Sequence, residues 1–201
     1  GQFVRLRTHG KTAHGCIPDA GVNSIEHMAR LLASFSEMDL FQARDPRYGA
    51  PTCTIGTIQG GVRTNVVPDL CEATLDIRLP PGILPQEVLI AFQERMTGLG
   101  IRGEAEPEEP GFPAYLTELD APVVQAATTA LHALGLPSEL GLAPFWSDLA
   151  YLRNAGIPSI VLGPGSILQA HSGDEYVEIE QLLRAAKIYA LTAVSFCGGL
   201  L

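Results

Sequence analysis

The sequence lacks an apolar run long enough to cross a membrane, and it is short of basic residues. A membrane span needs roughly 20 largely apolar residues, which no stretch of the 201-residue chain provides. The first residues, GQFVRLRTHGK, have no apolar core of the kind found in signal peptides, so no export is indicated. Only 13 Lys and Arg stand against 22 Asp and Glu, which gives a net charge of -9. Because phosphate binding needs a concentrated basic surface, we expect no nucleic-acid partner. With no membrane span and no signal peptide in the sequence, we also expect no membrane partner and a cytoplasmic location.

Cysteines are few and show no metal-binding spacing. The four of them are Cys16, Cys53, Cys71 and Cys197. Without a C-x-x-C pair a zinc knuckle is excluded, and the spacing gives no disulfide framework. With 46% apolar and 17% charged residues, the chain has the composition of a globular protein with a core. We expect the thiols to be reduced and packed, as in a cytosolic protein.

The order of elements in the first half predicts a ferredoxin-like domain. Asn23 is placed to cap a helix with Glu26 three residues on, and an apolar stripe follows: Ile25, Met28, Ala29, Leu32 and Phe35. In the strand CEATLDIRL the core-facing residues are Cys71, Ala73, Leu75, Ile77 and Leu79. The expected order is β-α-β-β-α-β, with strands at 2–9, 53–58, 71–79 and 101–106 and a second helix at 85–97. We assign residues 1–107 to this domain.

The second half has an α/β pattern but too few strands for a sheet of its own. The acidic, proline-rich residues 104–113 are typical of a linker. Helices are expected from a cap at Asp120, from a cap at Ser147, and over 178–196, the last with an apolar face made of Ile179, Leu182, Leu183, Ala186, Ala190 and Val194. Residues 157–162 are expected to form a short apolar strand. Because a parallel sheet must be covered on both faces, this half is interpreted as part of a larger sheet.

Two histidines lie where chemistry is common. His171 follows the apolar strand and a Gly-Pro-Gly turn, a position at which open α/β sheets bind ligands, and imidazole is a common metal ligand. His14 lies in a glycine-flanked turn, GKTAHG. From spacing alone, His171 could be a loop residue as readily as a ligand, and a surface histidine is the simpler interpretation of His14. One histidine cannot hold zinc, which takes at least three protein ligands.

The predicted hairpin holds two polar candidates. Asn65 is placed in the turn of GGVRTNVVPD, and Arg78 ends the motif DIR on the polar face of a strand. The planar guanidinium of Arg78 could hold a carboxylate by two-point contact. An ordinary surface arginine is the simpler interpretation when the hairpin is considered alone.

Taken together, these segments resemble one family over nearly the whole chain. It is the dinuclear zinc family of acetylornithine deacetylase, succinyl-diaminopimelate desuccinylase, aminoacylase and glutamate carboxypeptidase. The lid motif is GKTAHGCIPDAGVNSIE, the hairpin motif is GGVRTNVVPD followed by DIR, and the closing motif is LGPGSILQAHSGDEYV. They occur in the family's order and spacing. The closing motif, with APFWSD before it, is most similar to acetylornithine deacetylase.

The resemblance implies a role for each half of the chain. Residues 1–107 would be a lid that forms a homodimer. Residues 108–201 would be the C-terminal part of a zinc-peptidase-like α/β catalytic domain. In such enzymes a water activated by two zinc ions attacks the amide carbonyl of a small N-acyl amino acid.

It also implies roles for single residues. His14 matches the lid histidine that reaches across the dimer and stabilises the oxyanion in the partner's active site. Asn65 and Arg78 match substrate-holding residues, with Arg78 at the carboxylate. His171 matches a metal ligand. Two glycines match a loop at the mouth of the site, namely Gly163 and Gly165.

The sequence departs from the family in one large respect. The other histidine ligand, the bridging aspartate, the glutamate base and a further carboxylate ligand are not found in these residues. We therefore expect this chain alone to bind neither of the two zinc ions tightly and to be inactive, with the missing N-terminal half supplied in cis or in trans. Cobalt or manganese could replace zinc. The alternatives are a non-catalytic dimerisation module, or the C-terminal subunit of a split desuccinylase or dipeptidase.

Overall fold

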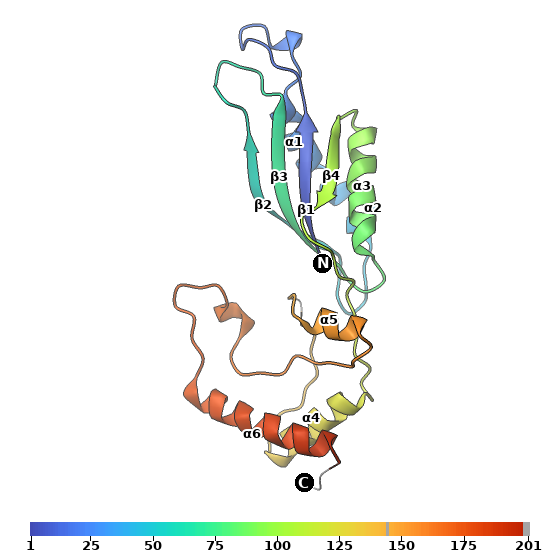
Figure 1. Cartoon of the computed structure of the whole chain (residues 1–201), viewed down its shortest axis with the longest axis vertical. Coiled ribbons are helices and arrows are strands. Elements are labelled where there is room, and N and C mark those ends of the chain that lie inside the picture. The colour runs from blue at the N-terminus through green and yellow to red at the C-terminus, as the bar shows by residue number, and fades with distance from the viewer. Residues whose placement is uncertain (144, 199–201) are drawn as a thin grey trace. The chain divides into compact units, whose positions relative to one another are not determined.

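The computed structural model describes residues 1–143 and 145–198. It divides into two compact units, Gly1–Ala114 and Tyr115–Leu201. Figure 1 labels the helices and strands of each unit. No helix within the described ranges is long and apolar enough to cross a membrane.

The first unit is a four-stranded antiparallel sheet with helices packed on one face. The strands are β1 (Gln2–His9), β2 (Thr52–Gly60), β3 (Leu70–Arg78) and β4 (Gly103–Pro107), in the order β2-β3-β1-β4. The helices are α1 (Ser24–Ala33), the short α2 (Asp39–Gln42) and α3 (Pro85–Gly98), with single 3₁₀ turns η1 (Pro18–Ala20) and η2 (Phe35–Glu37). This is the ferredoxin-like order, and the prediction made for the first half is confirmed. The order leaves β2 and β4 as the two sheet edges (Figure 1).

The core of this unit follows the alternation of the strands. Val4 and Leu6 of β1 are fully buried, and every second residue of β3 is as well. Phe92 of α3 and Met28 of α1 cover this face and have no exposed surface. Successive strand side chains point to opposite faces, so a single apolar face is sufficient to hold both helices. The inward residues predicted for the strand at 71–79 are all buried.

The start of α1 is fixed by its cap. The Asn23 side-chain carbonyl accepts hydrogen bonds from the backbone N–H groups of Ile25 and Glu26 at 3.0 and 3.3 Å. The Asn23 amide donates in turn to the Glu26 carboxylate at 2.9 Å. The cap is as predicted, but the predicted stripe is partly wrong, because Ile25 and Ala29 are exposed while Leu31 is buried. Helix α1 therefore presents an uncovered apolar strip beside its core face.

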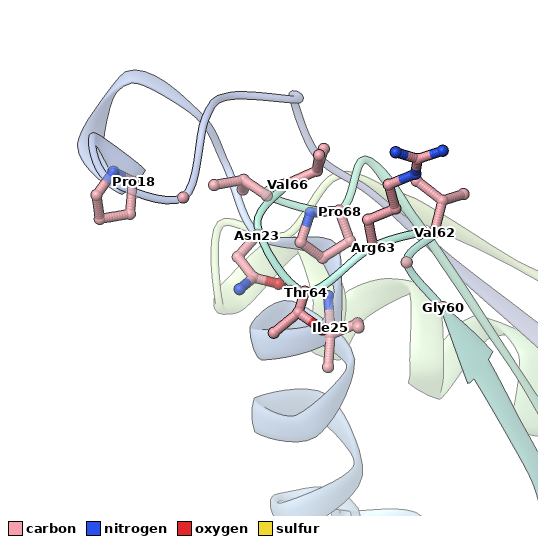
Figure 2. Close-up of a pocket in the computed structure, with 12 residues that line it drawn as sticks. Pro18, Asn23, Ile25, Gly60, Val62, Arg63, Thr64, Val66 and Pro68 are labelled. Carbon is pink, nitrogen blue, oxygen red and sulfur yellow. Dashed lines mark hydrogen bonds between the residues drawn. The ribbon is translucent and has the colours of Figure 1, made fainter.

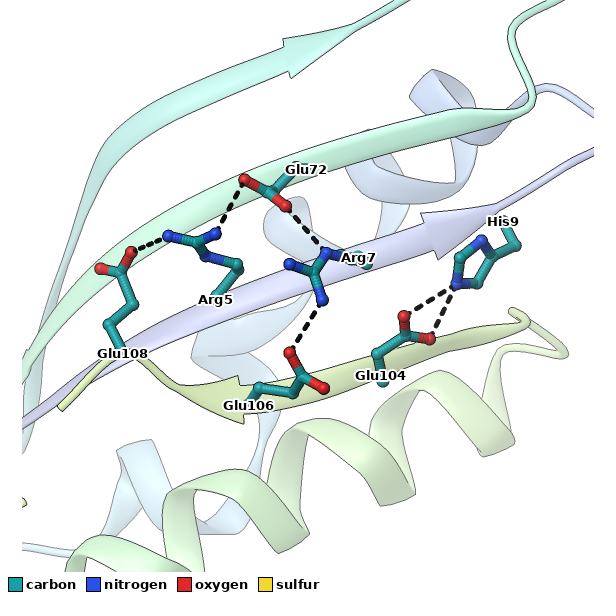
Figure 3. A network of polar contacts seen from close by, with 7 residues as sticks. All are labelled: Arg5, Arg7, His9, Glu72, Glu104, Glu106 and Glu108. Atoms are coloured by element: carbon teal, nitrogen blue, oxygen red, sulfur yellow. Dashed lines mark hydrogen bonds and ion pairs between the residues drawn. The ribbon is translucent and has the colours of Figure 1, made fainter. Parts of the chain in front are cut away.

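The opposite face of the sheet carries a network of paired charges (Figure 3). Arg7 donates to Glu72 and Glu106, each at 2.8 Å. Arg5 donates to Glu108 at 2.8 Å, and the other contacts are Arg5 with Glu72 and His9 with Glu104. Ion pairs this exposed contribute little to stability, because water and salt screen them. The network is thus a solvated surface whose arginines are already occupied by neighbouring carboxylates.

The second unit is helical in its described part. It contains α4 (Pro122–Ala133), α5 (Leu149–Asn154), the 3₁₀ turn η3 (Ile167–Gln169) and α6 (Ile179–Phe196). The strand predicted at 157–162 is not formed, because a strand needs hydrogen bonds to a neighbour and this unit offers none among its described residues. The expected caps are also shifted, since α4 and α5 begin after Ala121 and Asp148 without a side-chain cap.

Helix α6 packs through a face other than the predicted one. Ala185 and Ile188 are its buried residues. All six residues of the predicted apolar face are exposed, with Ile179 at 73% and Leu183 at 62%. The pattern marks a face suited to burial, but no described element of this unit covers it. Exposed apolar patches are common at interaction sites in general.

All four cysteines are free, but only two are packed. Cys71 is buried and Cys53 half-buried, whereas Cys16 and Cys197 are exposed, which corrects the expectation for that pair. Burial, with the negative charge of Asp76 adding to it, raises the pKa of the Cys53 thiol to about 11. Burial also raises the pKa of Cys71. Both groups are therefore almost entirely uncharged thiols near neutral pH, and the thiolate is the reactive form.

We predict two classes of thiol in the native chain at pH 8. A thiol reagent should label Cys16 and Cys197 rapidly and should reach Cys53 and Cys71 only after denaturant is added. Mass spectrometry of the labelled peptides against time measures this. Rapid labelling of Cys53 in the native chain would contradict the burial and the raised pKa.

Candidate functional site

Two loops at one end of the sheet are joined into a single structure, here called the lid tip (residues 10–23 and 61–69). The Gly10 N–H donates to the Asp69 carbonyl at 2.8 Å, and the Val67 N–H donates to the Ala13 carbonyl at 2.9 Å. The Gly15 N–H donates to the Asn65 carbonyl at 2.8 Å. This backbone ladder fixes two motifs that lie about fifty residues apart in the sequence.

Glycine is required where the two loops approach each other. A Cβ atom at Gly10 would lie 2.0 Å from the Val22 carbonyl oxygen of the same loop and 2.9 Å from the Pro68 carbonyl oxygen of the other loop, both too close for a real Cβ contact. Gly61 begins the second loop with a φ of +75°, a backbone conformation that favours glycine. The glycines of both motifs therefore make the ladder possible.

His14 lies on the exposed surface of the lid tip. Its backbone forms an isolated antiparallel bridge with Val66, and its carbonyl accepts the Ile17 N–H at 2.9 Å. Its ring nitrogen Nδ1 accepts a hydrogen bond from the Cys16 N–H at 3.2 Å. The backbone is thus fixed while the imidazole remains accessible from outside the unit.

Asn65 lies beside His14 in the same tip. Its backbone carbonyl takes part in the ladder, and its side chain is exposed. Next to it is an open hollow of about 570 Å³, lined by Asn23, Ile25, Arg63 and Thr64 among others (Figure 2). No role was expected for Arg63 or Thr64 from the sequence, although both lie inside the hairpin motif.

Arg78 is at the other end of the sheet. It is the last residue of β3, and it lies eight residues beyond Leu70. Leu70 is the end of the strand that adjoins the lid tip. At roughly 3.4 Å per residue the two ends of this strand are about 27 Å apart. Arg78 Nη2 contacts Asp76 Oδ2 at 2.6 Å, and its guanidinium lies 5.8 Å from the Phe3 ring centre. Within one lid, the structure brings His14 and Asn65 together but does not bring Arg78 to them.

In the second unit, Gly163 and Gly165 belong to a loop held against α6. The Gly165 N–H donates to the Gln181 side-chain carbonyl at 2.7 Å, and the Tyr189 hydroxyl donates to the Leu162 carbonyl at 3.0 Å. The loop and the helix enclose a small hollow of about 200 Å³. The two glycines thus lie on a shaped surface rather than in a free loop.

His171 has an unusual backbone conformation. Its φ of +62° is the one positive value found for a non-glycine residue in the described chain. The Glu175 carboxylate accepts the His171 backbone N–H at 3.2 Å, and the side chain is exposed. Left-handed backbone in a residue other than glycine is often associated with functional positions. The imidazole is presented to the outside of its unit.

The described residues do not make a complete metal site. No group of three or more His, Cys, Asp and Glu side chains gathers so as to hold a metal ion within residues 1–143 and 145–198. His171 offers a single imidazole, whereas catalytic zinc takes three protein ligands. The donor set here therefore fits one ligand position and no more.

We predict that zinc titration of this chain alone will show no tight binding of two equivalents. One histidine without partners binds zinc weakly, because the remaining coordination positions stay with water. Isothermal calorimetry with zinc at neutral pH measures this. Two equivalents bound with sub-micromolar affinity would contradict the ligand count.

The fold and the motifs agree with comparisons to known proteins. Residues 3–104 match the M20_dimer family, which is described as a peptidase dimerisation domain. The chain belongs to this family. Its ferredoxin-like first unit is the part that matches.

Named relatives match over nearly the whole chain. An acetylornithine deacetylase from Myxococcus xanthus is 30% identical, with 98% of this chain and 53% of the relative covered. An acetylornithine deacetylase from Klebsiella pneumoniae (strain 342) is 32% identical, with 96% and 51% covered. The chain thus spans about half the length of the curated relatives it matches.

Solved structures show the same fold. A tripeptidase from Staphylococcus aureus is 25% identical with a TM-score of 0.76, and the match covers 98% of this chain and 52% of the tripeptidase. An M20 family metallo-carboxypeptidase from Sulfolobus solfataricus is 17% identical with a TM-score of 0.74, and the match covers 96% of this chain and 57% of the carboxypeptidase. These structures share the fold of the chain, and the family resemblance stated from the motifs is confirmed by the family match and the named relatives.

Proposed function

We propose that this chain is part of a metal-dependent amidohydrolase that removes the acyl group from N-acyl amino acids, with N-acetylornithine as the first substrate to test. The named relatives support the substrate class. The observation that carries the proposal is the pairing of exposed His14 and Asn65 on one lid tip, built from two motifs joined by a backbone ladder.

The lid tip supplies hydrogen bonds rather than metal ligands in this proposal. Attack on an amide carbonyl places negative charge on its oxygen, and a donor held at that oxygen stabilises the transition state more than the substrate. His14 is the proposed donor, and the neighbouring Asn65 amide orients the substrate. His171 is proposed as one metal ligand, and the loop containing Gly163 and Gly165 as part of the mouth of the active site. Any metal, which is expected to be zinc, would polarise the carbonyl when bound.

The length of β3 supports a site shared between two subunits. Arg78 is about 27 Å along the strand from the lid tip, too far for His14 and Arg78 of one chain to hold one small substrate. We propose that Arg78 binds the substrate carboxylate in its own subunit, while His14 and Asn65 reach the substrate of the partner. A homodimer formed through the lid would bring both sets to each active site.

The two sheet edges differ in a way that favours β2 as the dimer contact. Edge strand β4 carries Glu104 and Glu106 and ends at Pro107, features that block pairing with another strand. Strand β2, TCTIGTIQG, has no charged residue. Its Ile55 and Ile58 are 43% and 50% exposed, and the exposed Ile25 and Ala29 of α1 are also apolar. An unpaired, uncharged edge beside an apolar helix strip suits a two-fold contact with a second copy.

The remaining metal ligands and the general base are proposed to come from polypeptide outside these 201 residues, in cis or in trans. The exposed apolar face of α6 supports this proposal, because apolar side chains of this kind are usually buried against further polypeptide. A non-catalytic dimerisation module is the second candidate. It has the same lid but would not need an accessible imidazole at the tip.

The proposal is tested by an assay of the chain together with that polypeptide. Purified protein with added zinc is incubated with N-acetylornithine, N-acetylcitrulline, N-succinyl-diaminopimelate and a dipeptide, and the free amine is measured. Hydrolysis of N-acetyl amino acids above the others supports the proposal. Hydrolysis of the dipeptide alone would indicate a peptidase. If no substrate is hydrolysed, the non-catalytic dimerisation module is the favoured function.

A further inference from the structure

We propose that the backbone amide of Cys16 holds His14 in the neutral tautomer that carries its proton on Nε2, so that Nε2 is the donor atom presented to a substrate. The inference rests on the proposed role of His14 in catalysis, but the tautomer itself can be measured without activity. In this arrangement the Cys16 amide is a positioning group, and the Cys16 thiol has no part in it.

The hydrogen bond decides which nitrogen carries the proton. The Cys16 N–H donates to His14 Nδ1 at 3.2 Å. A backbone N–H can only donate, so the nitrogen that accepts it must have a free lone pair. In a neutral imidazole the proton then lies on the other nitrogen, Nε2.

The turn around His14 keeps this contact in place. The Ile17 N–H donates to the His14 carbonyl at 2.9 Å, which closes a four-residue turn over Gly15 and Cys16. The Gly15 N–H and the bridge between His14 and Val66 tie the turn to the second loop of the lid tip. The amide that meets Nδ1 is therefore held by neighbours on both sides.

No charged side chain of the lid tip competes for the ring. Besides His14 and Cys16, the titratable residues on the two loops and on the first turn of α1 are Lys11, Asp19, Glu26, His27, Arg63 and Asp69. None of them makes a hydrogen bond or ion pair with His14 among the described residues, and Glu26 is bonded to Asn23. A carboxylate at Nδ1 would hold the opposite tautomer and favour the charged ring, whereas an amide N–H does neither.

The consequence is a restricted chemical role for His14. A ring held in this way can donate a neutral hydrogen bond from Nε2 to a developing oxyanion. It cannot donate from Nδ1, and it cannot accept a proton there without breaking the Cys16 contact. His14 is thereby assigned as a hydrogen-bond donor and not as the base of the reaction.

The tautomer is measured by nitrogen-15 NMR of the imidazole rings in the 201-residue chain near pH 8. The His14 signals are identified by their loss in His14→Gln. The expected result is a protonated Nε2 and an unprotonated Nδ1 in the wild type and in Cys16→Ala, which keeps the amide. Cys16→Pro removes the N–H, and the strong preference for Nε2–H should be lost. A wild-type ring with its proton on Nδ1 overturns the proposal whether or not the proline variant folds.

The donor atom is tested separately in the assembled enzyme. Glutamine can place its amide N–H near the position of Nε2, whereas the shorter asparagine reaches only the position of Nδ1. His14→Gln should retain a kcat roughly tenfold above that of His14→Asn, the value of one neutral hydrogen bond. The reverse order overturns the assignment of Nε2. If the enzyme hydrolyses none of the acyl substrates, the proposed function is wrong. The NMR measurement still tests the tautomer of His14 independently.

Discussion

Replacing His14 by alanine in the assembled enzyme is expected to lower kcat by about 10²–10³-fold with little change in KM. A donor aimed at the developing oxyanion acts in the transition state and hardly at all in the ground state, so its loss appears in kcat. The exposed ring makes no contact that holds the core of its unit, so the variant should fold as the wild type does. Steady-state kinetics with the best acyl substrate provide the measurement.

A second histidine serves as the control for that experiment. His132 lies on α4, is exposed, and contacts the Ser138 hydroxyl at 2.7 Å. His132→Ala removes another exposed imidazole, which has no place in the proposed site, and kcat should stay as in the wild type. If His14→Ala were as active as His132→Ala, the oxyanion role of the lid tip would be refuted.

Replacing Ile58 by aspartate is expected to convert a lid-mediated dimer into a monomer. Ile58 lies on the uncharged edge strand β2 and is half exposed in the single chain. A second copy packed there would bury the new carboxylate without a partner, which costs about 3–5 kcal/mol and weakens association by more than about 100-fold. Sedimentation velocity of the 201-residue chain over a range of concentrations measures the change.

The matched control places the same charge on another face of the same unit. Ile90 of α3 is 56% exposed, close to the value for Ile58, and α3 lies over β1 and β4 rather than at the β2 edge. Ile90→Asp should remain dimeric. A monomeric wild type, or dissociation by both substitutions alike, would rule out the β2 edge as the contact.

The fold of the first unit was largely predictable because its signals are local. Alternating apolar residues in β3 set which face is buried, and the Asn23 cap fixes where α1 begins. The second unit was predicted less well. Residues 157–162 have the composition of a buried strand, but a strand requires a neighbour, and none is present in the described residues of that unit. The exposed apolar face of α6 has the same cause.

The candidate site was predicted as a set of residues but not as an arrangement. The motifs mark His14, Asn65, Arg78 and His171 as candidates, since their residue types and surroundings are visible in the sequence, and their roles stay predictions. The contact between the Cys16 amide and His14 Nδ1 was missed, because a backbone N–H leaves no trace in residue identity.

The sequence by itself determined the elements of the lid, the acidic character of the whole chain and the motifs that mark the family, because these depend on periodicity, capping and residue type. Only the tertiary structure decided which of the marked residues meet. A ladder between two loops distant in sequence joins Asn65 to His14, and the length of an extended strand separates both from Arg78. Such distances depend on how strands pair and how far they run, and no single segment carries that information.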